Sequence, residues 1–278
     1  ALEITSTTDS FEECRTGEEY TIGTYNIGFG AYTPEYSFFM NGGKYSWAMS
    51  EDGLHENIDN IIGEIRSFEP DIMLLQEVDF GGTRTYNYDE RSRIEELLEP
   101  GNVAFAQNYD SPYLFWPVYQ PHGANKSGIF TYARFRITSS LRRRLPISES
   151  LSKLVDLDRC YSISRIPVEN GRELVIINIH MSAYGSNPSV REGQINMFTE
   201  EMRREYEAGN YVIVGGDFNH NLRDEIDPDA PGWAQIADPE LTIDGNAYTW
   251  VLPQGTTDQW QAQCPLKPTT PLHLSADK

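Results

Sequence analysis

The hydrophobic pattern in the middle of the chain changes between two periods, which predicts helices that alternate with buried strands. From Leu54 to Phe68, apolar side chains recur three and four residues apart, as is typical of one face of a helix. Residues 71–78 (DIMLLQEV) then form a continuous apolar run of strand length. Such a run is expected of a strand buried on both faces, in a sheet that helices cover.

The same reasoning assigns the other elements. We expect a short helix at 91–98, and a longer one that opens with a capping box at Ser189–Glu192 and is closed by Gly209. Residues 1–19 are polar and form a tail or an added edge strand, whereas 29–50 have no helical period and form a long loop. The expected strands are 20–28, 103–107, 128–133, 159–168, 173–181 and 211–215, and residues 222–278 are expected to be loop with one strand near 247–251.

Length and composition fit a single α/β domain over residues 20–278. Hydrophobic residues make up 39% of the chain and charged residues 23%, and no stretch approaches the roughly 20 apolar residues that span a bilayer. The formal net charge of −20 disfavours long polyanions, because their binding depends on Lys and Arg. A basic run at 142–144, near Arg134 and Arg136, is interpreted as a solvated surface strand.

The cysteines and the first residues leave the cellular compartment open. Cys14, Cys160 and Cys264 have no metal-ligand spacing, and an odd number cannot all pair, although one disulfide with one free thiol stays an alternative. The chain begins at Ala1 instead of a methionine, so an extracytoplasmic or membrane-anchored form is the expectation if an upstream segment was removed.

Polar side chains interrupt the apolar strands near their carboxyl ends. Each has an ordinary explanation on its own, since an Asn often forms a turn and a single His is often structural. In layered α/β proteins, however, ligands and catalysts gather at the carboxyl ends of strands. Carboxylates and amides that meet there make an oxygen-rich site of the kind that suits Mg²⁺. The residues concerned are Asn26, Glu77, Asn178, His180, Asp217 and Asn219.

The motifs around these residues resemble a known family. TYNIG, LLQEV, NIHMSAYG and GGDFNH occur in this order, and SGIFTYARFRI lies between the second and the third. This series is similar to that of the endonuclease/exonuclease/phosphatase family, which includes DNase I, abasic-site endonucleases, neutral sphingomyelinases and inositol polyphosphate 5-phosphatases. The resemblance covers about residues 20–220. It implies a DNase I-like four-layer sandwich, with two mixed β-sheets face to face and helices on the outside.

The resemblance also implies a role for each matching position. Glu77 and Asn26 match the residues that hold the metal, Mg²⁺ with Mn²⁺ as the alternative. His180, Asp217 and Asn219 match the catalytic residues, of which Asp217 orients or deprotonates the attacking water. The candidates for substrate binding are Asn178, Arg159, His122 and Asn125, although a sheet salt bridge is an equal explanation for Arg159.

One element of the family pattern is missing from the sequence. Members normally close with a strand that ends Ser-Asp-His, but the only late histidine, His273, has no Asp before it. His220 alternates away from Asn219 and is a poor substitute. We therefore expect the closing strand to be absent from this sequence, which leaves the activity of the chain as written open.

The predicted function is metal-dependent hydrolysis of a phosphodiester or phosphomonoester, by in-line attack of a water molecule. The negative charge favours a small or lipid-borne substrate over duplex DNA, and a metal-dependent endonuclease is the alternative. A second alternative is a non-catalytic protein that binds a phosphate or a partner. Loops 29–50 and 111–128 are expected to select the substrate, and their aromatic residues could stack on a base, enter a membrane surface or pack on the domain. A monomer is expected.

Overall fold

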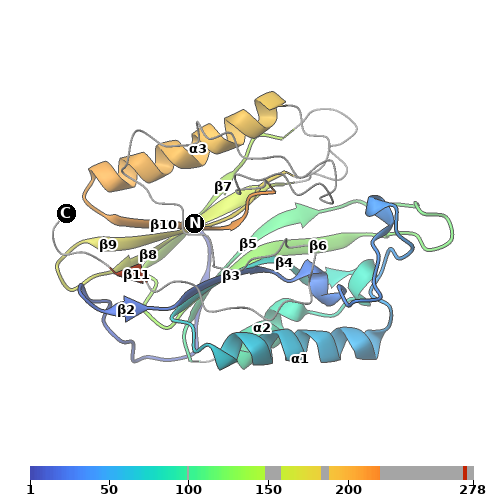
Figure 1. Cartoon of the computed structure of the whole chain (residues 1–278), viewed down its shortest axis with the longest axis horizontal. Helices are drawn as coiled ribbons and strands as arrows, with labels where there is room; N and C mark the ends of the chain where they lie inside the picture. Colours follow the sequence, from blue (N-terminus) through green and yellow to red (C-terminus); the bar gives the residue numbers. More distant parts are fainter. Residues whose placement is uncertain (99, 148–157, 183–187, 220–271, 274–278) are drawn as a thin grey trace.

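The computed structural model of the chain has four layers. Figure 1 shows two β-sheets face to face, with α3 (Pro188–Glu207) over one sheet and α1 (Glu51–Ser67) and α2 (Glu90–Leu97) over the other. The residues that the structure describes are 1–98, 100–147, 158–182, 188–219 and 272–273. This arrangement confirms the expected α/β sandwich of two mixed sheets with helices on the outside.

Both sheets are mixed. Across the first sheet the order is β1 (Ile4–Ser6), β5 (Asn102–Asp110), β6 (Asn125–Ala133), β4 (Ile72–Gly82) and β3 (Ile22–Asn26). Across the second sheet it is β10 (Tyr211–Asp217), β9 (Glu173–His180), β8 (Cys160–Pro167) and β7 (Ser139–Arg144). The β3–β4 and β10–β9 pairs are parallel, and the other neighbours are antiparallel. A separate ladder pairs β2 (Glu19–Tyr20) with β11 (Leu272–His273).

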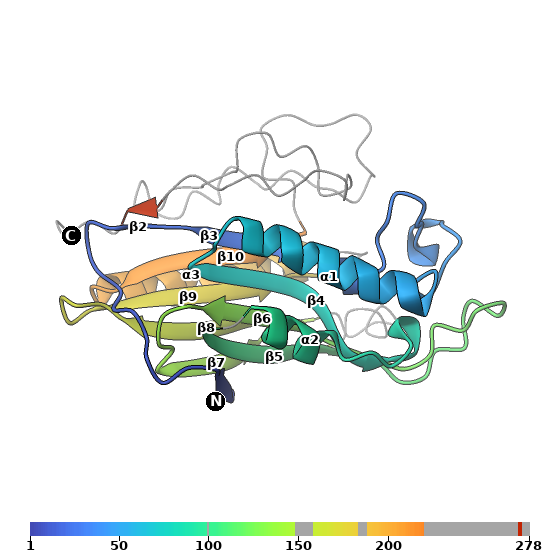
Figure 2. The same ribbon diagram turned by 90° about the horizontal axis from the view of Figure 1, so that it is seen from below.

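Alternate positions of the same strands fill the space between the sheets and the space under the helices. In β4, Ile72 and Leu74 belong to the core between the two sheets, whereas Met73 and Leu75 pack with α1. β9 alternates in the same way between the inter-sheet core and α3. Figure 2 shows α1 and α2 lying across the outer face of the first sheet. The apolar run at 71–78 is therefore buried on both faces, as its sequence predicts.

Differences from the expected boundaries have local causes. The first helix begins at Glu51, earlier than expected, because the Ser50 hydroxyl accepts a hydrogen bond from the Gly53 N–H and caps it. The expected strand over 20–28 is divided into β2 and β3. The capping box at Ser189 is wrong, because α3 already begins at Pro188 and Ser189 lies inside the helix. β4 continues four residues beyond 78, to Gly82, by pairing with β6 across two register shifts.

The N-terminal segment is an edge strand over part of its length, since β1 pairs with β5. The basic run lies on β7, where Arg143 and Arg144 are exposed, as expected, and the half-buried Arg142 donates to the Gln107 carbonyl at 2.7 Å. The loop at 29–50 contains two short 3₁₀ turns. None of the described helices is long and apolar enough to cross a membrane.

The remaining expectations fall partly outside the described residues. Cys14 and Cys160 are buried free thiols, so they do not pair with each other, and Cys264 lies outside the described part of the chain. The expected strand near 247–251 also lies outside it, as does most of the sequence in which the closing strand was sought. His273 lies in β11, beside β2.

Candidate active site

Three expected site residues share one face of the sandwich because of strand alternation. Side chains an even number of residues apart lie on the same face of a strand. In β3, β9 and β10, respectively, Ile22, Ile176 and Ile213 pack in the core between the sheets. The site residues follow four positions later, at the carboxyl end of each strand, and are Asn26, His180 and Asp217.

Glu77 reaches the same place through a β-bulge. Since Met73 and Leu75 pack with α1, strict alternation would direct Glu77 to α1 as well. Between Leu75 and Val78, however, the register with β6 shifts, and Glu77 has a φ of 56°. Because a bulge inserts one extra residue and bends the strand, the Glu77 carboxylate comes within 3.4 Å of the Asn26 amide nitrogen.

The side-chain amide of Asn26 lies between two carboxylates. Its Nδ2 donates a hydrogen bond of 2.7 Å to Asp217 Oδ2 and a longer one of 3.4 Å to Glu77 Oε1. Its Oδ1 accepts from the backbone N–H of Gly28 at 3.0 Å, which fixes the orientation of the amide. Asn26 thus holds the two acidic side chains around a single donor.

His180 faces the same two carboxylates from below the rim. Its Nε2 lies 3.7 Å from Asp217 Oδ2 and 3.9 Å from Glu77 Oε1. Burial lowers the pKa of His180 well below its usual value, and the positive charges of Arg159 and Arg84 lower it further. The imidazole is therefore neutral at neutral pH. Among the described residues, none gives its Nδ1 a hydrogen bond.

Asp217 is fixed by the turn that follows its strand. The backbone N–H of Asn219 donates to Asp217 Oδ1 at 2.8 Å, and the Asn219 side chain donates to the Met181 carbonyl at 2.8 Å. Gly216 has a φ of 141°, and a Cβ at this position would lie 2.0 Å from the Ile179 carbonyl. The second glycine of GGDFN, Gly216, is thus required because β9 approaches closely there.

Burial and nearby charges both shift the pKa of Glu77. Burial raises the pKa of Glu77, the charges of Arg84 and Arg159 partly offset this, and the Asp217 carboxylate raises it further. The Glu77 side chain is nevertheless 28% exposed, whereas those of His180 and Asp217 are nearly inaccessible. Two carboxylates that share one site repel each other, and a cation between them would relieve that repulsion.

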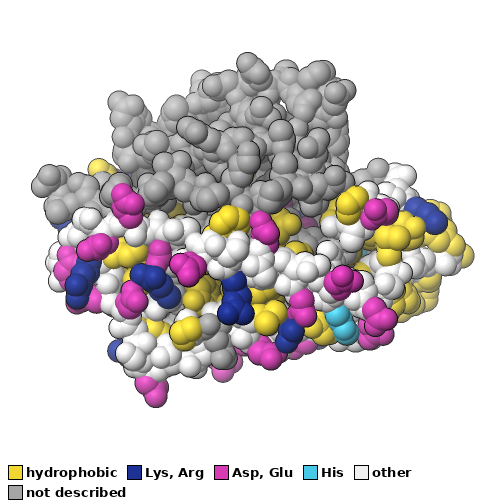
Figure 3. Space-filling model, turned by 60° about the horizontal axis from the view of Figure 1, so that its bottom comes forward, with side chains coloured by type: hydrophobic (Ala, Val, Ile, Leu, Met, Phe, Trp, Pro, Cys, Tyr) yellow, Lys and Arg dark blue, Asp and Glu magenta, His cyan; other side chains and the backbone are white. Residues whose placement is uncertain are grey.

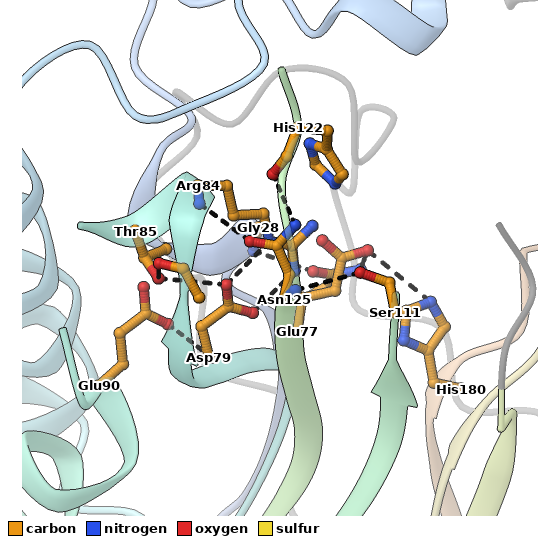
Figure 4. A network of polar contacts seen from close by, with 12 residues as sticks. Gly28, Glu77, Asp79, Arg84, Thr85, Glu90, Ser111, His122, Asn125 and His180 are labelled. Atoms are coloured by element: carbon orange, nitrogen blue, oxygen red, sulfur yellow. Dashed lines mark hydrogen bonds and ion pairs between the residues drawn. The ribbon is translucent and has the colours of Figure 1, made fainter. Parts of the chain in front are cut away.

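A buried ion pair stands behind Glu77 (Figure 4). Arg84 donates from Nε and Nη2 to the two carboxylate oxygens of Asp79 at 2.8 and 2.7 Å, and its guanidinium lies 3.8 Å from the centre of the Phe29 ring. Glu90 accepts from the Asp79 backbone N–H at 2.8 Å, and burial raises the pKa of Glu90 well above its usual value, which favours its neutral form. The sequence analysis did not identify this ion pair. Its only signal in the sequence was that Asp79 and Arg84 follow shortly after LLQEV.

The candidates for substrate binding occupy different surroundings. Asn178 is buried between the sheets, where its amide donates to the Phe130 carbonyl at 3.0 Å and accepts from Gln76 at 2.9 Å. Arg159 precedes β8, and its charge acts on the pKa of both Glu77 and His180. The structure thus places Arg159 near the carboxylates and gives Asn178 partners that join the two sheets.

His122 is buried in the loop between β5 and β6, and Asn125 is buried at the first position of β6. His122 Nδ1 lies 3.0 Å from the Ser46 hydroxyl, and burial lowers the pKa of His122 to about 3. Asn125 donates to the His122 carbonyl at 2.9 Å and accepts from the Arg84 N–H at 2.9 Å. In this structure both side chains are used to hold the loop and the segment around Arg84.

The donor set fits a hard divalent cation. Among the described residues, no three His, Cys, Asp or Glu side chains already form a ligand group. Glu77 and Asp217 do supply two carboxylates that converge on one amide, and Glu77 is open to solvent. Mg²⁺ is typically held by one or two carboxylates while it keeps several waters, so these residues could bind it without further protein ligands.

Comparison with known proteins decides the family. The model of the "Endonuclease/Exonuclease/phosphatase family" matches residues 23–266. The chain belongs to this family. Endonuclease/exonuclease/phosphatase proteins hydrolyse phosphate esters and generally use divalent metal ions. No curated protein matches the sequence.

Known structures of this family share the fold, and 66 chains match. An endonuclease/exonuclease/phosphatase from Beutenbergia cavernae DSM 12333 is 19% identical, with a TM-score of 0.50 over 78% of this chain and 51% of that one. The catalytic domain of human Nocturnin is 19% identical, with a TM-score of 0.46, and the match covers 77% of this chain and 68% of that one. Truncated TDP2 from Caenorhabditis elegans is 18% identical, with a TM-score of 0.44, and the match covers 77% of this chain and 68% of that one. The chain spans about half the length of the first of these. At 19% identity, this likeness shows the DNase I-like fold alone.

Proposed function

We propose that this protein hydrolyses a phosphodiester or phosphomonoester by in-line attack of a water molecule, with Mg²⁺ as the cation and Mn²⁺ as the alternative. The observation that carries the proposal is the convergence of Asn26, Glu77, His180 and Asp217, which come from four strands of two sheets. Glu77 would hold the cation, and Asn26 would orient the carboxylates on either side of it, mainly through its 2.7 Å bond to Asp217. When bound, the cation neutralises charge on the phosphate oxygens and on the leaving oxygen.

The other residues act on the water and the phosphate. Asp217 accepts a hydrogen bond from the attacking water and orients it, and Asn219 fixes the Asp217 carboxylate through its backbone N–H. A neutral His180 donates a hydrogen bond to a phosphate oxygen without adding charge. Arg159 contributes positive potential, and His122 and Asn125 act indirectly, by holding the loop beside the site.

The substrate is small or lipid-borne. A net charge of −20 opposes the binding of duplex DNA, whose affinity depends on phosphate contacts from many basic side chains. On the face shown in Figure 3, basic side chains are interspersed with acidic ones and form no continuous basic surface among the described residues. This distribution supports a substrate that presents one phosphate group to the site.

The test is hydrolysis of bis-p-nitrophenyl phosphate, sphingomyelin and DNA with Mg²⁺ or Mn²⁺. We expect Glu77→Ala to lower turnover by at least ~10²-fold, because the cation loses its most accessible carboxylate. Glu56→Ala, an exposed glutamate on α1, is the matched control and should leave turnover unchanged. The absence of hydrolysis of all three substrates with either cation would refute the proposal.

Two alternatives make different predictions. A metal-dependent endonuclease would cleave DNA faster than the other substrates and would lose activity steeply with salt. A non-catalytic binding protein would bind Mg²⁺ in calorimetric titration, lose that binding in Glu77→Ala, and hydrolyse nothing. Calorimetry on the wild type and the variant therefore separates an intact metal site from one that no longer binds the cation, and the hydrolysis assay separates a site that turns over from one that only binds.

A further inference from the structure

The loop between β5 and β6 leaves large apolar side chains in water. Residues 111–124 contain no Asp, Glu, Lys or Arg, although 23% of the chain is charged. Side chains this large are seldom left together in water unless something binds there. The exposed members, which we call the aromatic tip, are Tyr113 (50% exposed), Phe115 (77%), Trp116 (67%), Val118 (77%) and Tyr119 (68%).

The backbone of this loop is firmly held. Leu114 and Gly123 exchange two backbone hydrogen bonds of 3.0 Å. The Trp47 indole donates to the Pro121 carbonyl at 2.7 Å, and the Tyr119 hydroxyl donates to the Lys44 carbonyl at 2.9 Å. Because these contacts fix the loop against residues 44–47, the exposed side chains are presented outward by an ordered support. Little conformational entropy is then lost when the tip binds.

The aromatic tip lies at the same end of the molecule as the candidate active site. In Figures 1 and 2 the loop projects beyond the rest of the chain, on the side to which β4 and β5 lead, and Figure 3 shows hydrophobic side chains gathered at that end. The base of the loop joins the segment behind the site, since the Asn125 side chain accepts from the backbone N–H of Arg84 at 2.9 Å. Figure 4 shows Asn125 and Ser111 beside Glu77.

We propose that the aromatic tip inserts into a zwitterionic lipid surface and brings the candidate active site to lipid-borne phosphate esters. The statement about esters rests on the proposed function, whereas docking on lipid does not. A projecting, uncharged tip needs no pocket in its partner, and Trp and Tyr favour the boundary between headgroups and acyl chains. The net charge of −20 opposes anionic membranes, which selects a zwitterionic surface.

The experiment is co-sedimentation of the protein with phosphatidylcholine vesicles in a chelator. We expect Phe115→Ser combined with Trp116→Ser to weaken partitioning at least ~10-fold, because two exposed aromatic side chains no longer leave water. Phe115→Leu combined with Trp116→Leu is the matched control and should keep most of the binding. Thermal unfolding should be similar for both double variants, since the two side chains pack little in the folded chain.

Several results would overturn the proposal. One is that the wild type stays in the supernatant at millimolar phosphatidylcholine. Another is that it binds only vesicles with anionic lipid at low salt. A third is that ultracentrifugation shows a dimer that the serine variant dissolves, because the tip would then bind a second copy. The chelator makes binding independent of hydrolysis. Vesicle binding in the chelator, together with no hydrolysis of any of the three substrates when Mg²⁺ or Mn²⁺ is present, would refute the proposed function and leave docking intact.

Discussion

Replacing Asn26 by aspartate tests whether one amide holds the two acidic side chains of the site. Asn26→Asp keeps an oxygen for the Gly28 N–H and nearly the same shape, but it removes the donor to Asp217 and Glu77. A hydrogen bond to a charged group contributes about 1.5–3 kcal/mol, and the 2.7 Å bond to Asp217 should account for most of this. The longer bond to Glu77 adds little, and a third negative charge adds repulsion.

Without a divalent cation, the variant should therefore lose about 2–3 kcal/mol of unfolding free energy. For a domain of this size, that loss lowers the unfolding midpoint by roughly 4–12 °C. Millimolar Mg²⁺ should recover more stability in the variant than in the wild type, because a third carboxylate strengthens an oxygen site for this cation. Differential scanning calorimetry, with chelator and with Mg²⁺, measures both effects.

Asn57→Asp is the matched control. Its Nδ2 donates a 2.7 Å hydrogen bond to the Gly30 carbonyl, a neutral acceptor, so its loss should cost about 1 kcal/mol and should not respond to Mg²⁺. If Asn26→Asp is as stable as the wild type in chelator, the amide does not hold the carboxylates. If both variants respond equally to Mg²⁺, the cation binds elsewhere.

Three further substitutions test buried and paired carboxyl groups of the fold. Asp79→Asn leaves the buried Arg84 without its counter-charge and should cost about 3–5 kcal/mol of unfolding free energy in urea denaturation, whereas Glu90→Gln should cost under about 1 kcal/mol, because burial already favours the neutral form. Burial raises the pKa of Glu205, but hydrogen bonds from Arg165 and Asn210 outweigh it and hold the pKa below its usual value. A depressed folded pKa gives stability above the unfolded pKa of about 4.3, which is lost as pH falls through the folded value. Glu205→Gln should thus destabilise at pH 7, and this effect should shrink as the pH falls below the unfolded pKa; an effect of the same size at every pH would contradict this.

Much of the site could be predicted from strand alternation alone. Asn26, His180 and Asp217 each follow an apolar run at a position that shares a face with buried residues of the same strand. Such periodicity is local, so it is visible in the sequence. The positions of β3, β9 and β10 relative to one another depend on the tertiary structure. The order of the motifs indicated these positions only through the resemblance to a family.

Glu77 shows where alternation fails. Its position along β4, two residues after Leu75, predicts that it faces α1. Only the bulge between Leu75 and Val78 directs its side chain toward the site. A glutamate at a φ of 56° costs about 1–2 kcal/mol, which local propensity argues against. The burial of Arg84 was equally invisible, because it depends on Asp79 and on Phe29 from a distant loop.

Residues without a chemical role set the spacing that the site needs. The sheets are joined directly below it by the 2.9 Å hydrogen bond between Gln76 and Asn178. They approach closely at Gly215, where a Cβ would lie 2.7 Å from the Leu74 side chain. The Asn26 amide reaches one carboxylate from each sheet, so the spacing of the sheets decides whether both carboxylates can share this donor. The fold therefore positions the candidate site through its inter-sheet packing, and Gly215→Ala should weaken Mg²⁺ binding in calorimetric titration without altering any residue of the site.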